Sequence, residues 1–161
     1  MNPYDIIDKY YNDNEPLRTL LITHSELVTR KAVDAAEKHP ELGANIQFIK
    51  EAGMLHDIGI FLTDAPGIYC HGKEPYLCHG ILGAELMRKE NYPRHARVCE
   101  RHTGAGLTAE EIEKQNLPLP HKDFFFRVDI FRAAAVNRTD IICVRIFTRR
   151  NLRITHIRPC F

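Results

Sequence analysis

The chain has 161 residues, which is enough for one domain with a buried core. Its hydrophobic fraction of 44% and charged fraction of 27% are typical of a globular protein and exclude a low-complexity or fibrous chain. No apolar run approaches the roughly 18–20 residues of a membrane span, so we expect no membrane partner. The first residues lack a basic region followed by an apolar core, so we expect a cytoplasmic location.

Cysteine usage agrees with that location. The five cysteines are an odd number and contain no Cys-x-x-Cys pair, so we expect reduced thiols. The net charge of +1 hides an asymmetry between two parts of the chain. Residues 1–121 contain 13 basic and 18 acidic residues, whereas residues 122–161 contain 9 and 3. We therefore treat 1–121 and 122–161 as segments of different character.

Helix-capping residues and apolar periodicity divide the first segment into helices. Asn2-Pro3 predicts a short helix that ends near Tyr11, and Asn14-Glu15-Pro16 predicts a long one that ends near Lys38. Further helices are predicted over residues 44–58, from residue 79, over residues 93–102 and from residue 108. In the helix over residues 44–58, Ala52 and Gly53 are small enough to let the helix with His24 approach closely, and Gly59 suits its C-terminal cap. Residues 60–78 show no periodicity and predict a long loop. The predicted fold class is therefore all-α, a single helical bundle.

Four histidines of separate helical segments are predicted to face inward. His24 falls within an apolar stripe that includes Leu20 and Leu27, so we expect it in the core. The others are His56, His79 and His102, and Asp57 follows the first of these. Imidazole and carboxylate ligands together suit a divalent transition metal, Fe, Mn, Zn, Co or Ni, better than calcium. One or two such ions held between helices explain all four histidines.

The segment Leu55-His56-Asp57-Ile58-Gly59 contains the letters HDIG. With the flanking histidines, it resembles the HD-domain superfamily of metal-dependent phosphohydrolases over roughly residues 17–121. The resemblance implies an all-α bundle in which His24, His56 and Asp57 bind a metal ion. It implies that His79 and His102 bind a second metal ion or the phosphate of the substrate. Members of that superfamily hydrolyse phosphate esters of nucleotides and related compounds.

Other polar residues have weaker claims to a role. Asp64 follows the HDIG segment and is a candidate for orienting a ligand histidine, or else an ordinary turn residue. Cys70-His71 and Cys78-His79 are a candidate zinc site, although their spacing matches no common zinc motif. Three cations are candidates for phosphate contacts, or else solvated surface charges: Lys73, Arg101 and Lys122.

The second segment departs from the superfamily pattern, which ends with an Ala-Asp pair after an apolar triplet. Here Val144-Arg145 follows Ile141-Ile142-Cys143, so the closing aspartate ligand is missing. Asp140 lies one turn too early, and nothing in the pattern supports Asp129. Eight arginines and no lysine follow Lys122. We hypothesise a shifted reading frame, because the codons of residues 144–151 can encode an Ala-Asp segment in another frame. The alternative is a basic tail that binds nucleic acid or acidic lipid.

These observations predict a metal-dependent phosphohydrolase in which Asp57 is both ligand and catalytic residue. The expected partner is a small-molecule phosphate ester, a nucleotide or a sugar phosphate. No basic-aromatic pattern indicates nucleic acid, and the sequence does not indicate an oligomeric state. The alternative is a degenerate HD domain that binds metal, ligand or partner without turnover, because the closing aspartate is missing.

Overall fold

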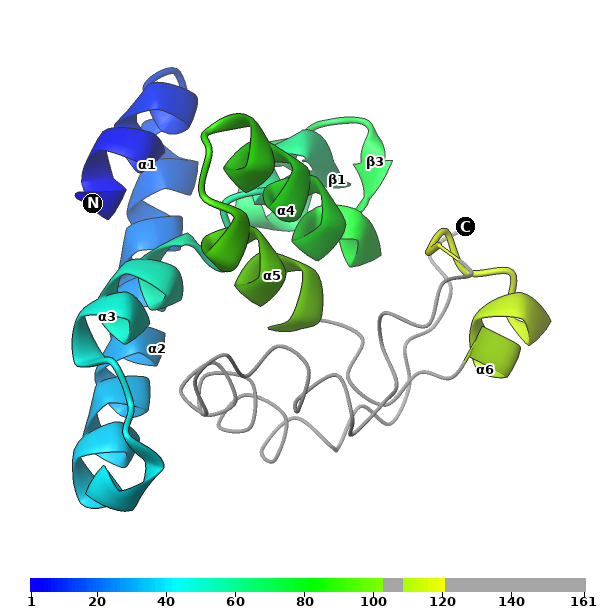
Figure 1. The fold of residues 1–161 in the computed structure, drawn as a ribbon. Helices are drawn as coiled ribbons and strands as arrows, with labels where there is room; N and C mark the ends of the chain where they lie inside the picture. Colours follow the sequence, from blue (N-terminus) through cyan, green and yellow to red (C-terminus); the bar gives the residue numbers. More distant parts are fainter. Residues whose placement is uncertain (103–108, 121–161) are drawn as a thin grey trace.

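The computed structural model describes residues 1–102 and 109–120, and its chain is helical apart from one small sheet (Figure 1). The predictions for residues 122–161, including the missing aspartate and the frameshift, lie outside the described residues. The all-α prediction is confirmed at the level of fold class, because six α-helices account for most of the described chain. No helix in these two ranges is long and apolar enough to cross a membrane.

Helices α1 (Pro3–Tyr11), α2 (Glu15–Lys38) and α3 (Ile46–Leu55) lie along one side of the molecule (Figure 1). The capping predictions are confirmed, since the side chains of Asn2 and Asn14 accept bonds from the amides of Tyr4 and Leu17, both at 3.2 Å. A short 3-10 helix, η1 (Pro40–Leu42), turns the chain from α2 towards α3. The third helix is shorter than predicted, because it ends before His56.

Helix α3 packs closely on α2 because one of its residues has no side chain. A Cβ atom at Gly53 would lie 2.4 Å from Oγ1 of Thr29 and 3.2 Å from its Cα atom. The sequence predicted a close approach here between the helix with Gly53 and the helix with His24, and the structure confirms it. This contact brings the end of α3 towards the middle of α2.

The segment predicted as a loop forms short 3-10 helices and a three-stranded sheet of order β2-β1-β3. Strand β1 (Thr63–Ala65) pairs antiparallel with β2 (Cys70–His71) and parallel with β3 (Glu74–Pro75). The 3-10 helices are η2 (Ile60–Leu62), η3 (Pro66–Ile68) and η4 (Tyr76–Cys78). A Cβ atom at Gly72 would lie 2.0 Å from the carbonyl of Leu62. Only glycine therefore allows the backbone at residue 72 to pass this close to Leu62. Strands of two or three residues are too short to show an alternating pattern, which explains why the sequence did not reveal them.

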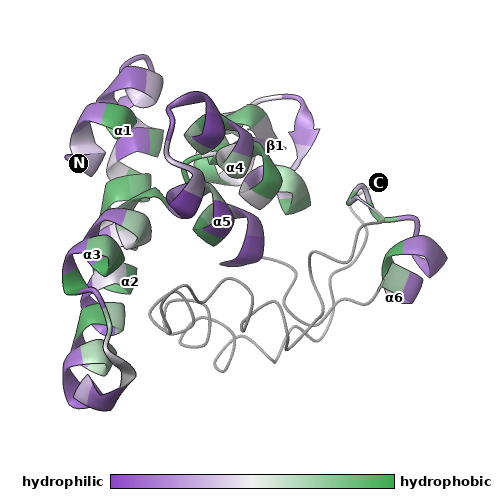
Figure 2. Ribbon diagram, in the orientation of Figure 1, coloured by the Kyte–Doolittle hydropathy of each residue, from purple (hydrophilic) through white to green (hydrophobic). Residues whose placement is uncertain are grey.

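Helices α4 (His79–Lys89) and α5 (Pro93–His102) pack against each other and beside α3. Figure 2 shows hydrophobic and hydrophilic residues mixed along the helices, as expected where each helix buries one face. The largest buried cluster joins residues of α1 to α5, and its members include Ile7, Leu21, Leu55, Met87 and Cys99. The last described helix, α6 (Ala109–Lys114), buries Ile112. The bundle thus leaves His24, His56, His79 and His102 on four elements that converge.

Candidate metal centre

His56 and Asp57 lie in the turn directly after α3. The amide of Ile58 donates a hydrogen bond to the carbonyl of Leu55, and the amide of Ile60 donates one to the carbonyl of Asp57, both at 3.1 Å. Neighbouring side chains within a helix point about 100° apart, but α3 ends at Leu55, before both residues. As a result, Nε2 of His56 lies 3.1 Å from Oδ2 of Asp57.

Gly59 was expected to cap the C-terminus of the helix, and this was wrong, because the helix ends at Leu55. Its φ of −87° and ψ of −2° are accessible to any residue. The glycine is needed for space instead, because a Cβ atom would lie 2.3 Å from the carbonyl oxygen of His79 and 2.4 Å from the amide of Gly83. Gly59 therefore allows the first turns of α4 to contact the turn that carries Asp57.

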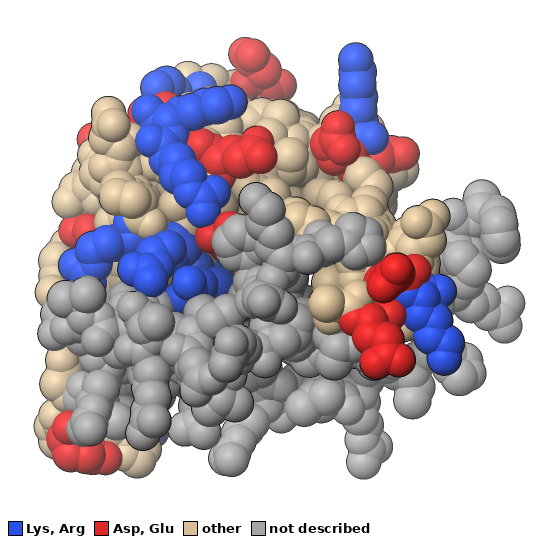
Figure 3. All heavy atoms as spheres, turned by 45° about the vertical axis from the view of Figure 1, so that its right-hand side comes forward, with Lys and Arg blue, Asp and Glu red and all other residues tan. Residues whose placement is uncertain are grey.

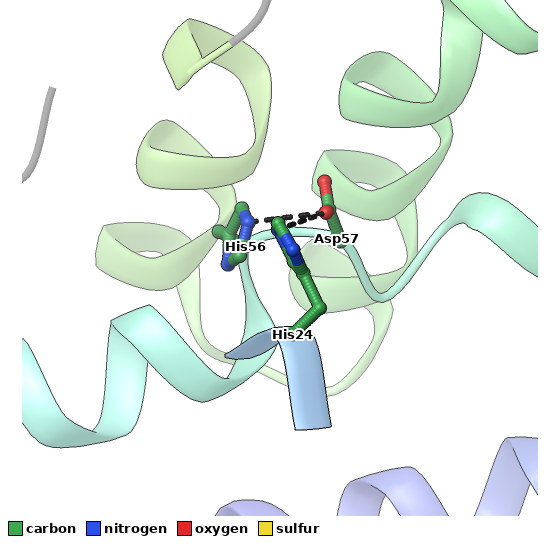
Figure 4. Close-up of side chains that lie close together, drawn as sticks. All are labelled: His24, His56 and Asp57. Atoms are coloured by element: carbon green, nitrogen blue, oxygen red, sulfur yellow. Dashed lines mark ion pairs between the residues drawn. The ribbon is translucent and has the colours of Figure 1, made fainter. Parts of the chain in front are cut away.

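His24 completes a first group around Oδ2 of Asp57. Its Nε2 atom extends from the middle of α2 to within 3.2 Å of that oxygen (Figure 4). Figure 4 shows His24 and His56 approaching the same carboxylate from different elements. The donor atoms of His24, His56 and Asp57 all lie within 4.8 Å of one another, as in a group that could hold one metal ion.

The other oxygen of Asp57 faces a second group. Oδ1 lies 3.2 Å from Nε2 of His79, the first residue of α4, and 2.8 Å from Nε2 of His102, the last residue of α5. The two Nε2 atoms lie 3.0 Å apart. Asp57, His79 and His102 thus form a second group of metal-ligand size that shares its carboxylate with the first.

Three of the four rings are oriented by the backbone. Nδ1 of each lies 2.6–2.7 Å from the carbonyl oxygen three residues earlier; the pairs are His56 with Gly53, His79 with Tyr76, and His102 with Cys99. A carbonyl oxygen only accepts hydrogen bonds, so Nδ1 must carry the proton and donate. In a neutral ring, Nε2 then has a lone pair that points towards Asp57. A backbone carbonyl that fixes the tautomer in this way is a common partner of metal-binding histidines.

This arrangement brings together groups that repel one another unless a cation is present. The Nε2 atoms of His79 and His102 face each other at 3.0 Å, and both face a carboxylate oxygen, so that without a proton they are two acceptors. Two acceptors at this distance need a proton or a metal ion between them. The donor sets of both groups therefore fit a divalent metal.

Burial and charge have opposite effects on the carboxylate. Burial tends to raise the pKa of Asp57, but the charges of His56 and His102 and hydrogen bonds from His102 and His24 lower the pKa well below its ordinary value. Asp57 is therefore an anion at neutral pH. The hydrogen bond to Asp57 raises the pKa of His24, whereas burial lowers the pKa of His102. A proton therefore competes more readily for His24 than for His102.

The predicted inward position of His24 was wrong in one respect. Its side chain is 46% exposed, although its ring nitrogen reaches Asp57. Leu27, which was assigned to the same buried stripe, is 48% exposed. Both lie beside a cavity of about 470 Å³ that also borders Asp57. Helical spacing alone placed these residues on one face, but it did not reveal that the face borders a cavity.

The remaining candidates are not part of the two groups. Asp64 is an exposed residue of β1, and its orienting role stays a prediction. Among the described residues, the two metal-ligand groups contain neither Cys70 nor Cys78; the thiol of Cys78 instead lies 3.0 Å from the carbonyl of Pro118. Lys73 is exposed and Arg101 is half-buried on α5, while Lys122 lies outside the described residues.

Sequence reasoning missed the part that Tyr76 plays. Its carbonyl orients His79, and its ring lies 4.6 Å from the His79 ring, centroid to centroid. The sequence could have revealed the role of the Tyr76 carbonyl, because the residue three positions before a helical histidine presents its carbonyl to the ring. The contribution of the Tyr76 ring required the tertiary structure.

Comparisons with known proteins found relatives in archaea. The chain is 36% identical over 106 residues to a tRNA (cytidine(56)-2'-O)-methyltransferase of Picrophilus torridus. The matched residues make up 65% of this chain and 26% of that protein. It is 34% identical over 107 residues to an uncharacterised protein of Methanocaldococcus jannaschii, 56% of which is covered. A tRNA (cytidine(56)-2'-O)-methyltransferase of Thermoplasma volcanium is 34% identical over 99 residues, 25% of its length. The match thus spans between a quarter and about half of these relatives.

No solved structure matches the chain. A match to the family described as HD domain covers residues 21–146, which is most of the chain. This range contains all five residues of the two groups and extends beyond the described part of the structure. The superfamily suggested by the HDIG segment is thereby confirmed. The chain belongs to the HD domain family.

Proposed function

We propose that the protein is a metal-dependent phosphohydrolase that acts on a small phosphate ester, a nucleotide or a related compound. The observation that carries the proposal is the shared carboxylate. Asp57 places one oxygen in each of two groups, and every Nε2 atom of the four histidines lies within 3.2 Å of it. HD domains bind divalent metals, and these donors fit Fe, Mn, Zn, Co or Ni.

His24, His56 and Asp57 would hold one ion, and Asp57, His79 and His102 would hold a second ion or the substrate phosphate. A bound divalent metal neutralises phosphate charge and lowers the pKa of water to near neutrality. The chain itself supplies rigidity, because carbonyls of the helical backbone fix the rings of His56, His79 and His102. Asp57 supplies a negative charge that persists at neutral pH, because its pKa is well below the ordinary value.

A small phosphate ester suits the described surface better than a polynucleotide does. Basic and acidic side chains both occur on the described part of the face drawn in Figure 3. Two basic residues are neutralised by carboxylates: Arg88 lies 2.7 Å from Glu100, and Lys9 lies 2.6 Å from Glu90. Polynucleotide binding depends on uncompensated basic residues. The methyltransferase names belong to relatives of which this chain matches about a quarter, and we do not transfer that reaction to it.

The first test is metal content followed by hydrolysis. Protein purified without chelator is analysed for transition metals and then assayed with manganese or cobalt against p-nitrophenyl phosphate and a panel of nucleotides. We expect bound metal, hydrolysis, and loss of both in a His56→Gln variant. The matched control is His39→Gln, which replaces an exposed histidine beside Glu41. Absence of metal from both the purified and the manganese-treated wild type would contradict the proposal.

A second candidate function follows from the segment after Cys143, where the Ala-Asp pair of the superfamily is absent. A domain without that ligand would bind metal and phosphate without turnover. The same experiment distinguishes the two functions. Stoichiometric metal with no hydrolysis of any phosphate ester would favour the binding function, whereas hydrolysis that depends on His56 would favour the enzyme.

A further inference from the structure

The cavity of about 470 Å³ beside the first group of metal-ligand residues has mostly apolar walls. Its volume is within the range of small-molecule sites. The apolar lining residues come from α2 and from the segment after the HDIG turn: Leu20, Leu21, Leu27, Ile60, Ile68 and Tyr76. The other lining residues are Thr23 and two members of the metal centre, His24 and Asp57.

Two large apolar side chains of this cavity remain accessible to solvent. Leu27 is 48% exposed and Tyr76 is 43% exposed. Leu27 lies on α2, one helical turn after His24, so both residues are on the same face of the helix. The Tyr76 ring is tilted against the His79 ring, with 4.6 Å between the ring centroids, and the Tyr76 carbonyl accepts a hydrogen bond from His79. The cavity is therefore bordered by Leu27 and by an aromatic ring that contacts the second group.

The charges around the cavity restrict which ligands fit. Among the described residues that line it there is no lysine or arginine, and Thr23 and Tyr76 each provide one hydroxyl. A second or third phosphate would meet no positive side chain of this lining, and a sugar would find few hydrogen-bond partners for its hydroxyls. A flat apolar group would instead contact Leu27 and Tyr76 and remove both from water.

We propose that this cavity binds an aromatic or similarly flat, uncharged group of the substrate and that Leu27 and Tyr76 determine specificity for it. The ligand is then a phosphate monoester whose single phosphate points to the Asp57 groups. The inference rests on the proposed function, because it assumes that a phosphate binds at the metal centre. Of the two substrate classes that the sequence left open, it favours a nucleotide with an aromatic base and a single phosphate over a sugar phosphate.

Binding of two non-hydrolysable probes tests this inference without reference to activity. Phenylphosphonate and methylphosphonate carry the same charged group and differ in the ring. Their affinities for the manganese-treated protein are measured by isothermal titration calorimetry. We expect phenylphosphonate to bind about tenfold more tightly than methylphosphonate, in line with the worth of one good aromatic contact.

Variants assign that advantage to the two residues. We expect Leu27→Asn to lose the preference for phenylphosphonate while its affinity for methylphosphonate is unchanged. Tyr76→Ala should also lose the preference, which is measured as the ratio of its two affinities because the Tyr76 ring contacts His79 as well. Tyr76→Phe keeps the ring and should keep the preference. The matched control is Tyr69→Ala, which removes a tyrosine that is 49% exposed and does not line the cavity.

Each other outcome contradicts the inference in a distinct way. Equal affinity of wild type for the two probes would overturn the cavity assignment and leave the proposed function intact. The same follows if the preference survives both Tyr76→Ala and Leu27→Asn, or if both variants lose methylphosphonate binding equally, which would indicate a structural role. If wild type bound neither probe, the proposed function and this inference would both fail.

Discussion

Oδ1 of Asp57 lies 2.8 Å from Nε2 of His102, which joins the turn after α3 to the last residue of α5. The other carboxylate oxygen faces His24 and His56. One side chain therefore connects two groups of histidines that come from four segments of the chain. Loss of this carboxylate should affect both groups, whereas loss of a single histidine should affect one.

The first prediction concerns Asp57→Asn, which keeps the shape of the side chain and removes its charge. We expect metal to be lost from both groups, with affinity lowered by more than about 100-fold, since even loss of an outer partner of a ligand costs about 10- to 100-fold. Elemental analysis after dialysis against a dilute metal solution measures this. The control Asp13→Asn changes an exposed aspartate in the turn between α1 and α2 and should retain metal. Unchanged metal content in the Asp57 variant would rule out a shared ligand.

The second prediction separates the two groups. His24→Gln removes a ligand of the first group only, and His102→Gln removes a ligand of the second group only. If each group holds one ion, each variant should retain one ion and the double variant none. Native mass spectrometry of metal-treated protein counts the ions. Loss of all metal in either single variant would show instead that the histidines form one site.

The third prediction is that Gly59→Ala destabilises the contact between α4 and the turn that carries Asp57. The new Cβ atom would lie 2.3 Å from the carbonyl oxygen of His79 and 2.9 Å from Cα of Gly83, so the backbone must move. Overpacking of this kind typically costs about 1–3 kcal/mol of unfolding free energy. Because His79 begins α4, metal in the second group should weaken more than metal in the first.

Urea unfolding and metal titration measure the two effects. Gly67→Ala is the control, since a Cβ atom there meets nothing within 4 Å. If the stabilities of the Gly59 and Gly67 variants were equal, the close contact would not be a constraint in solution.

The fourth prediction concerns pH and a histidine outside the metal centre. Burial lowers the pKa of His95 below its ordinary value of 6.5, and the nearby Glu51 carboxylate offsets only part of this effect. The unfolded chain therefore binds a proton at His95 more readily than the folded chain does. Neutral His95 therefore contributes to the unfolding free energy. This contribution is complete above about pH 6.5 and is lost as the pH falls below that value.

Denaturant unfolding at a series of pH values, with chelator present, tests the prediction. A His95→Gln variant does not titrate at this position, so its unfolding free energy should fall less between neutral and acidic pH than that of wild type. His102, whose pKa is also lowered by burial, contributes equally in both proteins. Identical slopes for the His95 variant and wild type would refute the assignment.

Much of the fold could be predicted because local interactions determine it. Asn2 and Asn14 cap the first two helices as expected, and Gly53 permits the close packing on α2 that its size suggested. The short strands between Leu62 and Tyr76 could not be predicted. Their pairing depends on contacts such as the bond from the amide of Gly72 to the carbonyl of Thr63, at 2.8 Å, and on no local pattern.

The sequence by itself determined that His24, His56, Asp57, His79 and His102 belong together, because helical spacing and the HDIG segment restrict where these side chains point. It could not determine that Asp57 divides its two oxygens between two groups, since that depends on where four separate segments meet. Only the tertiary structure decided that Gly59 provides space for α4 and that Leu27 and Tyr76 border a cavity. These properties arise from contacts between residues far apart in the chain, and periodicity within one helix carries no information about them.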